Sequence, residues 1–208
     1  MSQEPGAAIR VEWHEVLLRL AGWLSDNDLF QARESLAEGG LDRVAYLIRD
    51  AISAGLVPYS AEDAARLQSL LAAHGVDPSL VEAGVRQSLE PPPWGFAPVP
   101  PWGIGPSVTD AVDQAAIDAA ADSPVTTLTR VWRYPPTALQ VPRRIYLAET
   151  TTDADLPVVT HHLHSALVRA GEPTPQVEVY TAESRLPEYH RSAISQAEPL
   201  WPTQTDAE

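Results

Sequence analysis

Between residues 9 and 90, apolar positions recur at the three- and four-residue spacing of one helical face. Turn residues divide this stretch into segments, of which the fifth begins at Pro78 and runs toward Leu89. The pattern predicts an all-α first half of about five helices, with the first four over residues 9–24, 25–39, 41–54 and 60–75.

Two of these segments begin in the same way. Ser25 and Ser60 each offer a capping hydroxyl, and an aspartate follows three residues later, Asp28 or Asp63. At the same offset of 35 residues Gly40 meets Gly75, so the half reads as two repeated helical hairpins after one extra helix. The alternative is that cap and stop chemistry common to all helical hairpins produced these matches by chance. A true repeat would favour a surface that binds another protein.

After residue 124 the sequence pattern indicates strands as well as helices. Runs rich in β-branched residues at 125–133, 143–150 and 176–181 predict three strands, and amphipathic segments at 156–170 and 186–197 predict two helices. Strand, helix and strand in this order imply a right-handed crossover and a parallel pair. The predicted class is therefore α+β in two modules, with a C-terminal three-stranded mixed sheet.

The segment between these halves is rich in proline. Pro91 to Pro106 reads PPPWGFAPVPPWGIGP, without a charged side chain, and the tetrapeptide PPWG occurs twice, eight residues apart. Prolines at this density exclude a helix or a central strand, so we expect polyproline-like structure or turns. The segment is either a strap packed on the protein or a displayed ligand for an aromatic-lined groove. Its aromatic residues favour the strap, because exposing them would invite aggregation.

An acidic, alanine-rich helix capped by Thr109 is expected after it, between Ser107 and Asp122. Its apolar face is thin, so we expect it to be the most mobile part of the chain. These boundaries predict a helical interaction domain at 1–90, a strap with the acidic helix at 91–122, an α/β domain at 123–201 and a disordered tail at 202–208.

Composition and charge narrow the choice of partner. The 208-residue chain carries a net charge of −14, divided evenly between its halves, so a polyanion or an anionic membrane would be repelled. All 14 basic residues are arginine, which points to a GC-rich, bacterial coding sequence. Cysteine is absent, which excludes disulfides and thiolate metal sites. The N-terminus does not resemble a signal peptide, and no apolar stretch is long enough to span a bilayer, so we expect a cytoplasmic protein.

Large aromatic and apolar residues are the first candidates for a binding surface. Trp13 and Trp23 lie nearly opposite each other on the first predicted helix, so one of them is expected to be core and the other to face a partner. The strap supplies Trp94, Phe96, Trp102 and Ile104.

Histidines are the only metal-ligand candidates beyond carboxylates. His161 and His164 would be neighbours on the outer side of a helix, and His190 is the nearest candidate for a third ligand. No HExxH motif is present, so we expect no metal and no cofactor.

Two functions remain open. The favoured one is a non-catalytic adaptor or regulatory subunit with a protein partner and, as an open question, self-association. The rival is a small-ligand-binding or hydrolytic domain that uses side chains at the strand ends, where ligands bind in open α/β sheets. Its candidate residues are Arg143, Glu149, Glu178 and Glu183. A pocket converging on these residues would favour the rival, and an apolar patch around the tryptophans would favour the adaptor.

Overall fold

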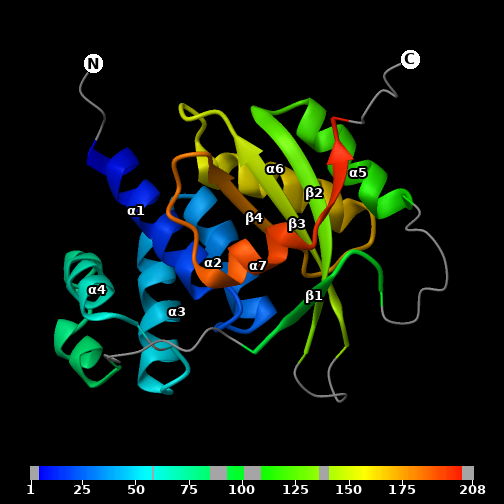
Figure 1. Cartoon of the computed structure of the whole chain (residues 1–208). Coiled ribbons are helices and arrows are strands. Elements are labelled where there is room, and N and C mark those ends of the chain that lie inside the picture. The colour runs from blue at the N-terminus through cyan, green and yellow to red at the C-terminus, as the bar shows by residue number, and fades with distance from the viewer. Residues whose placement is uncertain (1–4, 58, 85–92, 101–108, 136–140, 203–208) are drawn as a thin grey trace. The chain divides into compact units, whose positions relative to one another are not determined.

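A computed structural model describes residues 5–57, 59–84, 93–100, 109–135 and 141–202 (Figure 1). The chain divides into two compact units, Met1–Pro92 and Pro93–Glu208. The first contains helices and the second a mixed sheet with helices, so the α+β class is confirmed. Residues 203–208 of the predicted tail and Trp102 and Ile104 of the strap lie outside the described residues.

Unit 1 is built from α-helices whose apolar faces pack together. Their buried residues include Trp13, Leu17, Leu36, Ile48 and Leu71, each with less than 2% of its surface exposed. The elements are α1 (Pro5–Leu20), α2 (Asp26–Ala37), α3 (Leu41–Ser53), α4 (Ala61–Ala73) and the 3₁₀ helix η1 (Pro78–Gly84). Consecutive helices contact each other, and α1 also contacts α4.

The first helix ends earlier than its apolar spacing predicts. It stops at Leu20, because the chain turns through Gly22, which has a φ of 80°. A left-handed conformation of this kind favours glycine and ends a helix. Trp23 therefore follows α1 and is half-buried, whereas Trp13 is fully buried within it.

The two serine caps form as predicted. Ser25 accepts a hydrogen bond from the backbone N–H of Asp28 at 3.1 Å, and its hydroxyl donates to the Asp28 carboxylate at 2.7 Å. Ser60 and Asp63 repeat both contacts at the same distances. Serine and aspartate thus fix the start of α2 and α4 by the same local chemistry.

The two hairpins differ at their other ends. The left-handed glycine after α2 is Gly39, with a φ of 78°, and the one after α4 is Gly75, with a φ of 70°. These are 36 residues apart, one more than the serines, because α4 is one residue longer than α2. The partner of α4 also differs: the predicted fifth α-helix is the 3₁₀ helix η1, in which Val81 is buried and Leu80 is exposed.

The described residues of unit 2 form a five-stranded sheet, two strands more than predicted. Strands β2 and β3 are antiparallel, and β3 and β4 are parallel through α6, as the strand–helix–strand order implies. The elements are β1 (Gly95–Ala97), α5 (Ala111–Ala121), β2 (Val125–Tyr134), β3 (Arg143–Thr150), α6 (Leu156–Arg169), β4 (Gln176–Thr181), α7 (Glu188–Ser195) and β5 (Glu198–Trp201).

The two strands that were not predicted share one edge of the sheet. Both pair antiparallel with β2, opposite β3: β5 beside residues 128–130 and β1 beside residues 132–134. Strand β1 comes from the proline-rich segment, so the expectation of only polyproline or turns there was wrong. Three residues between prolines suffice for an edge strand, because an edge leaves one row of backbone donors without a required partner.

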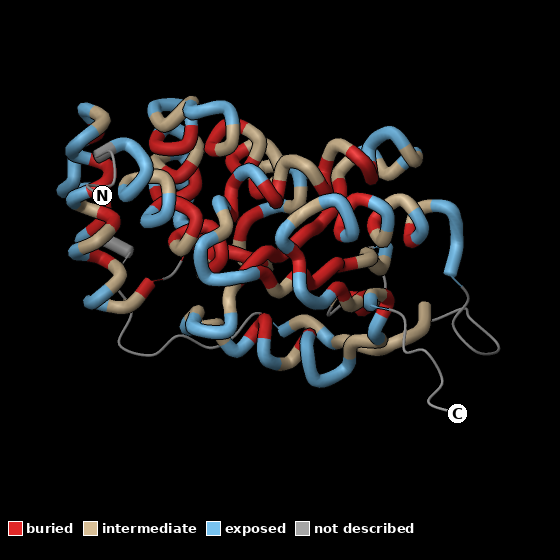
Figure 2. The backbone as a smooth tube through the Cα atoms, turned by 90° about the horizontal axis from the view of Figure 1, so that it is seen from above, coloured by how far each residue is buried: buried red, intermediate tan, exposed pale blue. Residues whose placement is uncertain are grey.

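The two faces of the sheet carry different helices (Figure 1). Helices α5 and α6 pack on the face formed by Leu128, Tyr146, Ala148, Val177 and Val179. Helix α7 lies on the opposite face, which carries the alternate residues of the same strands. Figure 2 shows stretches of buried residues alternating with exposed ones along the chain.

Helix α6 buries one apolar face, formed by Leu156, Val159, Leu163, Ala166 and Leu167, in line with the amphipathic pattern. It also buries His164 completely, so the expectation that this histidine lies on the outer side was wrong. Helix α5 is capped by Asp110 and not by Thr109. Among the described residues, no helix combines the length and apolar character needed to cross a membrane.

Candidate functional site

Four residues from three different predictions meet on the α7 face of the sheet. Trp94 and Phe96 come from the strap, Glu178 from the strand carboxylates and His190 from the histidines. Together with Arg133 and Tyr189, which join them, they are called here the α7-face cluster. It is the candidate functional site.

Arg133 forms the centre of this cluster. Its side chain extends from β2 on the α7 face, where it is 3% exposed, and its guanidinium lies 4.4 Å from the centre of the Trp94 ring. The same guanidinium donates to the Tyr189 hydroxyl at 3.1 Å. Arginine suits this position because a planar cation can stack on a ring and donate in its own plane.

The strap completes this arrangement through Phe96. Strand β1 places Phe96 opposite Arg133, and the Phe96 and Tyr189 rings meet edge to face with centroids 5.2 Å apart. Trp94 and Phe96, two residues apart, therefore contact the same face of the sheet. Backbone pairing and two aromatic contacts together hold the strap to the β2 edge.

Glu178 and His190 form the inner end of the cluster. The His190 Nε2 and the Glu178 Oε2 lie 2.9 Å apart, and the His190 ring meets the Tyr189 ring edge to face at 5.3 Å. His190 exposes none of its surface, and Glu178 exposes 1%. A carboxylate–imidazole pair has general-base chemistry, but this pair is closed to a substrate in the described conformation.

The remaining predicted ligand residues do not converge on this site. Arg143 begins β3, with its guanidinium 3.9 Å from Glu172, whereas Glu149 lies near the other end of the same strand. Six residues of extended strand separate them by about 20 Å. Glu183 is exposed in the turn after β4. The strand-end pocket of the rival function is therefore not assembled from these residues.

The other histidines lie apart from the cluster. His161 on α6 is half-buried and lies 3.5 Å from the Ser165 hydroxyl, whereas His164 is buried. In the described part of the chain, no group of three histidine or acidic side chains has the geometry to hold a metal ion.

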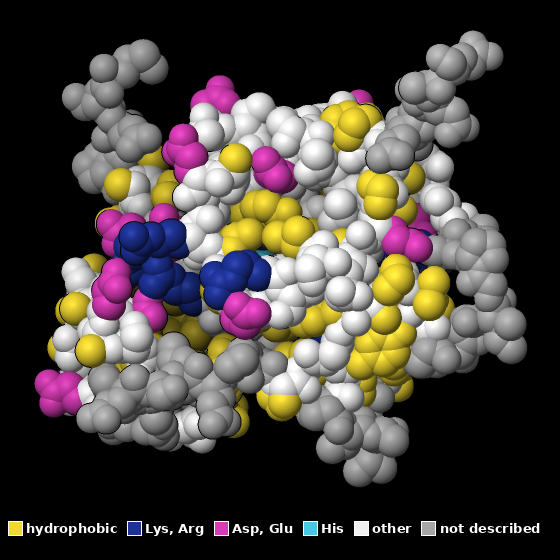
Figure 3. All heavy atoms as spheres, in the orientation of Figure 1, with side chains coloured by type: hydrophobic (Ala, Val, Ile, Leu, Met, Phe, Trp, Pro, Cys, Tyr) yellow, Lys and Arg dark blue, Asp and Glu magenta, His cyan; other side chains and the backbone are white. Residues whose placement is uncertain are grey.

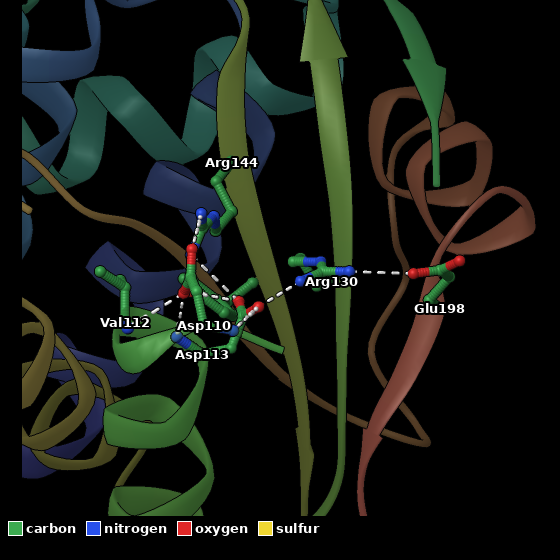
Figure 4. Close-up of polar contacts among 7 residues, drawn as sticks. Asp110, Val112, Asp113, Arg130, Arg144 and Glu198 are labelled. Atoms are coloured by element: carbon green, nitrogen blue, oxygen red, sulfur yellow. Dashed lines mark hydrogen bonds and ion pairs between the residues drawn. The ribbon is translucent and has the colours of Figure 1, made fainter. Parts of the chain in front are cut away.

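A second buried cluster lies on the opposite face, beneath α5 (Figure 4). Arg130 of β2 forms an ion pair with Asp113 of α5 and donates to Glu198 of β5 at 2.9 Å. Asp113 is fully buried and also accepts from the Tyr146 hydroxyl at 2.8 Å. This α5-face cluster ties α5, β2, β3 and β5 together.

Arg144 closes the α5-face cluster toward solvent. It donates to both carboxylate oxygens of Asp110, at 2.6 and 2.8 Å. This pair of hydrogen bonds is the main reason why the pKa of Asp110 falls to about 2. Burial, aided by the charge of Asp113, raises the pKa of Tyr146 above its ordinary value. Three carboxylates and two arginines thus form one network of ion pairs, which favours a structural role for this cluster.

Trp23 lines a small cavity of unit 1, together with Leu20, Tyr59 and the Arg19–Asp63 ion pair. Its volume is about 40 Å³, well below the roughly 300 Å³ at which ligand sites begin. It has room for water only.

Sequence reasoning missed Arg133 and Tyr189, the two residues that join the cluster. A signal existed for Arg133: in an alternating strand it shares a face with Val131, and an inward arginine needs partners. Nothing in the sequence indicates which ones, because Trp94 and Tyr189 are 39 and 56 residues away from it.

Comparison with known proteins gives no match to a family model, to a curated protein or to a solved structure.

Proposed function

We propose that this chain is a non-catalytic protein–protein interaction module, working as an adaptor or regulatory subunit of a bacterial cytoplasmic complex. The observation that carries the proposal is the way the strap is held: a three-residue strand, a cation–π contact and an edge-to-face aromatic pair fix Trp94 and Phe96 on the β2 edge. These are the contacts by which sheets bind extended peptides.

The strap continues this edge as an apolar surface. Pro98, Val99 and Pro100 are all half-exposed, and the Tyr134 hydroxyl donates to the Val99 carbonyl. Trp132, also half-exposed, lies on the α5 face of the same edge, and the Arg144 guanidinium is 5.0 Å from the centre of its ring. Figure 3 shows hydrophobic side chains gathered on the right-hand side of the view, where the segment after β1 runs.

The composition of this surface suits a protein partner. Tryptophan, tyrosine and arginine dominate the energetics of protein interfaces, and proline-rich chain loses little entropy when it binds. The chain's negative charge excludes a polyanionic partner on electrostatic grounds. We therefore place the partner-binding surface on the strap edge of unit 2.

Partner capture by the full-length chain tests this proposal. Trp132→Ala removes the stacked tryptophan from the proposed surface, and Tyr46→Ala is the matched control, because Tyr46 is an exposed ring of α3 with Arg49 4.9 Å from its centre. We expect a host protein that binds the wild type and the control variant to be lost from Trp132→Ala, by tenfold or more for an interface tryptophan. Equal binding by both variants would contradict the proposal.

The rival hydrolytic or ligand-binding function has one supporting contact, the Glu178–His190 pair. Its burial argues for a structural role, because no substrate reaches either group in the described conformation. A screen for hydrolytic activity with Glu178→Gln as the inactive control would favour the rival if activity vanished while the melting temperature stayed constant.

A further inference from the structure

The β1 position on the sheet edge is a binding site with definite requirements. It takes a tryptophan that stacks on Arg133, an apolar side chain two residues later that meets Tyr189, and backbone that pairs with residues 132–134.

The chain carries two such segments. Pro92 to Phe96 reads PPWGF and supplies the bound strand, and Pro100 to Ile104 reads PPWGI. The second segment repeats the tryptophan and the apolar residue at the same spacing, and its isoleucine has a high strand propensity. The second copy therefore offers the same tryptophan for Arg133 and the same spacing for backbone pairing, with an aliphatic side chain in place of the Phe96 ring.

We infer that the β2 edge is a peptide-binding site for the sequence Pro-Pro-Trp-Gly-apolar, and that the two copies in this chain compete for it. The proposed occupant in the alternative state is the segment Pro100–Ile104 of the same chain. This inference rests on the proposed function, because the copy that leaves the edge becomes available to a partner.

We expect the competing segment to come from the same chain, because its tether keeps its local concentration at the edge high. A segment tethered eight residues from the bound copy is present at an effective concentration on the order of millimolar, far above a second molecule in dilute solution. Eight residues of extended chain span about 26 Å, enough to exchange one copy for the other.

The bound strand is also short enough to exchange. Strand β1 has three residues, and Trp94 and Phe96 remain half-exposed in the bound state. Short strands of this kind contribute few ladder hydrogen bonds, so a second copy with the same tryptophan and spacing competes for the same backbone partners.

Disulfide trapping tests this inference directly in the full-length chain. The chain has no cysteine, so two introduced thiols have no competitors. Gly95 faces Tyr134 in the ladder, and a Cβ at Gly95 would lie 3.6 Å from the Tyr134 Cβ. That separation suits a disulfide, for which Cβ atoms are about 3.5–4.5 Å apart.

The decisive variant pairs Gly103→Cys with Tyr134→Cys, because Gly103 is the counterpart of Gly95 in the second copy. Gly95→Cys with Tyr134→Cys is the positive control, and Gly105→Cys with Tyr134→Cys reports random collision. After equilibration in a glutathione buffer, mass spectrometry of peptides measures each disulfide. We expect the Gly103 pair to form an intramolecular bond at least tenfold more readily than the Gly105 pair, as matched geometry raises effective concentration.

Three results would overturn the inference. The Gly103 pair could oxidise no better than the Gly105 pair, it could form only intermolecular bonds, or Trp102→Ala could leave its oxidation unchanged. Because all three pairs replace Tyr134, any loss of stability is common to them and the positive control reveals it. Loss of the partner in the Trp132→Ala experiment is measured separately, so failure of this inference and failure of the proposed function remain distinguishable.

Discussion

At the scale of single residues, strand β2 carries an inward arginine on each face of the sheet. Arg130 meets Asp113 on the α5 face, and Arg133 meets Trp94 and Tyr189 on the α7 face. Each is 3% exposed. A buried charge is stable only where polar or aromatic partners replace its hydration, so each arginine requires specific neighbouring side chains.

The Asp113–Arg130 pair leads to a prediction on stability. Asp113→Asn keeps the size of the side chain but leaves the buried Arg130 charge without its main counter-ion, so we expect a loss of about 3–5 kcal/mol in unfolding free energy. Urea denaturation at pH 7 measures it. Asp118→Asn, on the exposed side of the same helix, is the control and should change stability by less than about 0.5 kcal/mol. Similar losses in both variants would show that Asp113 acts only through general helix charge.

At the scale of elements, the start of α5 combines a cap with an ion pair. Asp110 accepts from the backbone N–H of Val112 and Asp113, and Asp113 accepts from the Asp110 backbone in return. The capping box orients the Asp110 carboxylate toward Arg144 of β3. Asp110, which caps α5, thus also attaches this helix to the sheet.

Because Asp110 both caps α5 and pairs with Arg144, we expect it to make a pH-dependent contribution to the free energy of unfolding. The Arg144 hydrogen bonds lower the folded-state pKa of Asp110 to about 2, from an ordinary value of 3.8. A depressed pKa adds stability that is present above pH 4 and is lost as the pH falls from 4 to 2. Asp110→Asn keeps a capping acceptor, so the difference from wild type isolates the ion pair.

We expect Asp110→Asn to be less stable than wild type by about 1 kcal/mol at pH 7, because the group is half-exposed and solvent weakens the pair. The two unfolding free energies should approach each other as the pH falls from 4 to 2 and converge below pH 2. Chemical denaturation across this range measures the difference, and a difference that stays constant with pH would contradict the assignment.

The edge shared by β1 and β5 is the element-scale feature that sequence patterning could not supply. Val125 to Tyr134 is long and rich in β-branched residues, so its strand character is evident from the chain alone. Strands β1 and β5 have three and four residues and contain or adjoin proline. They are strands because β2 offers backbone partners at two successive places, which is a property of the folded sheet.

At the scale of the whole molecule, negative charge is the dominant feature. The net charge is −14 and the isoelectric point is about 4.7. The ion pairs described here are mostly partly or fully buried, so salt screens them less than it screens the repulsion among exposed carboxylates. Repulsion of this kind opposes the folded state.

We therefore expect stability to rise with ionic strength. Between 10 mM and 300 mM NaCl at pH 7.5, the melting temperature should increase by a few degrees, corresponding to about 1 kcal/mol. Calorimetry or circular dichroism measures it. The same titration near pH 4.7 is the control, because the net charge is then close to zero and the salt effect should nearly vanish. A fall in melting temperature at pH 7.5 would show that exposed ion pairs outweigh the repulsion.

Sequence alone determined the features that depend on neighbours a few residues apart. The serine caps, the amphipathic face of α6 and the boundaries of β3 and β4 follow from local spacing, because hydrogen bonds of helix starts and the period of side chains act within one or two turns. It also selected Trp94, Phe96, Glu178 and His190 as residues of interest, although for different roles.

Only the tertiary structure decided that these four residues belong to one cluster. Arg133 contacts Trp94 and Tyr189, which are 39 and 56 residues away, and Tyr189 contacts Phe96, which is 93 residues away. Such contacts depend on which strand edge remains open and which helix covers which face. Those are outcomes of packing the whole sheet. The physical reason is that a buried charge requires polar partners and an open strand edge requires backbone partners, but neither requirement specifies which distant residue meets it.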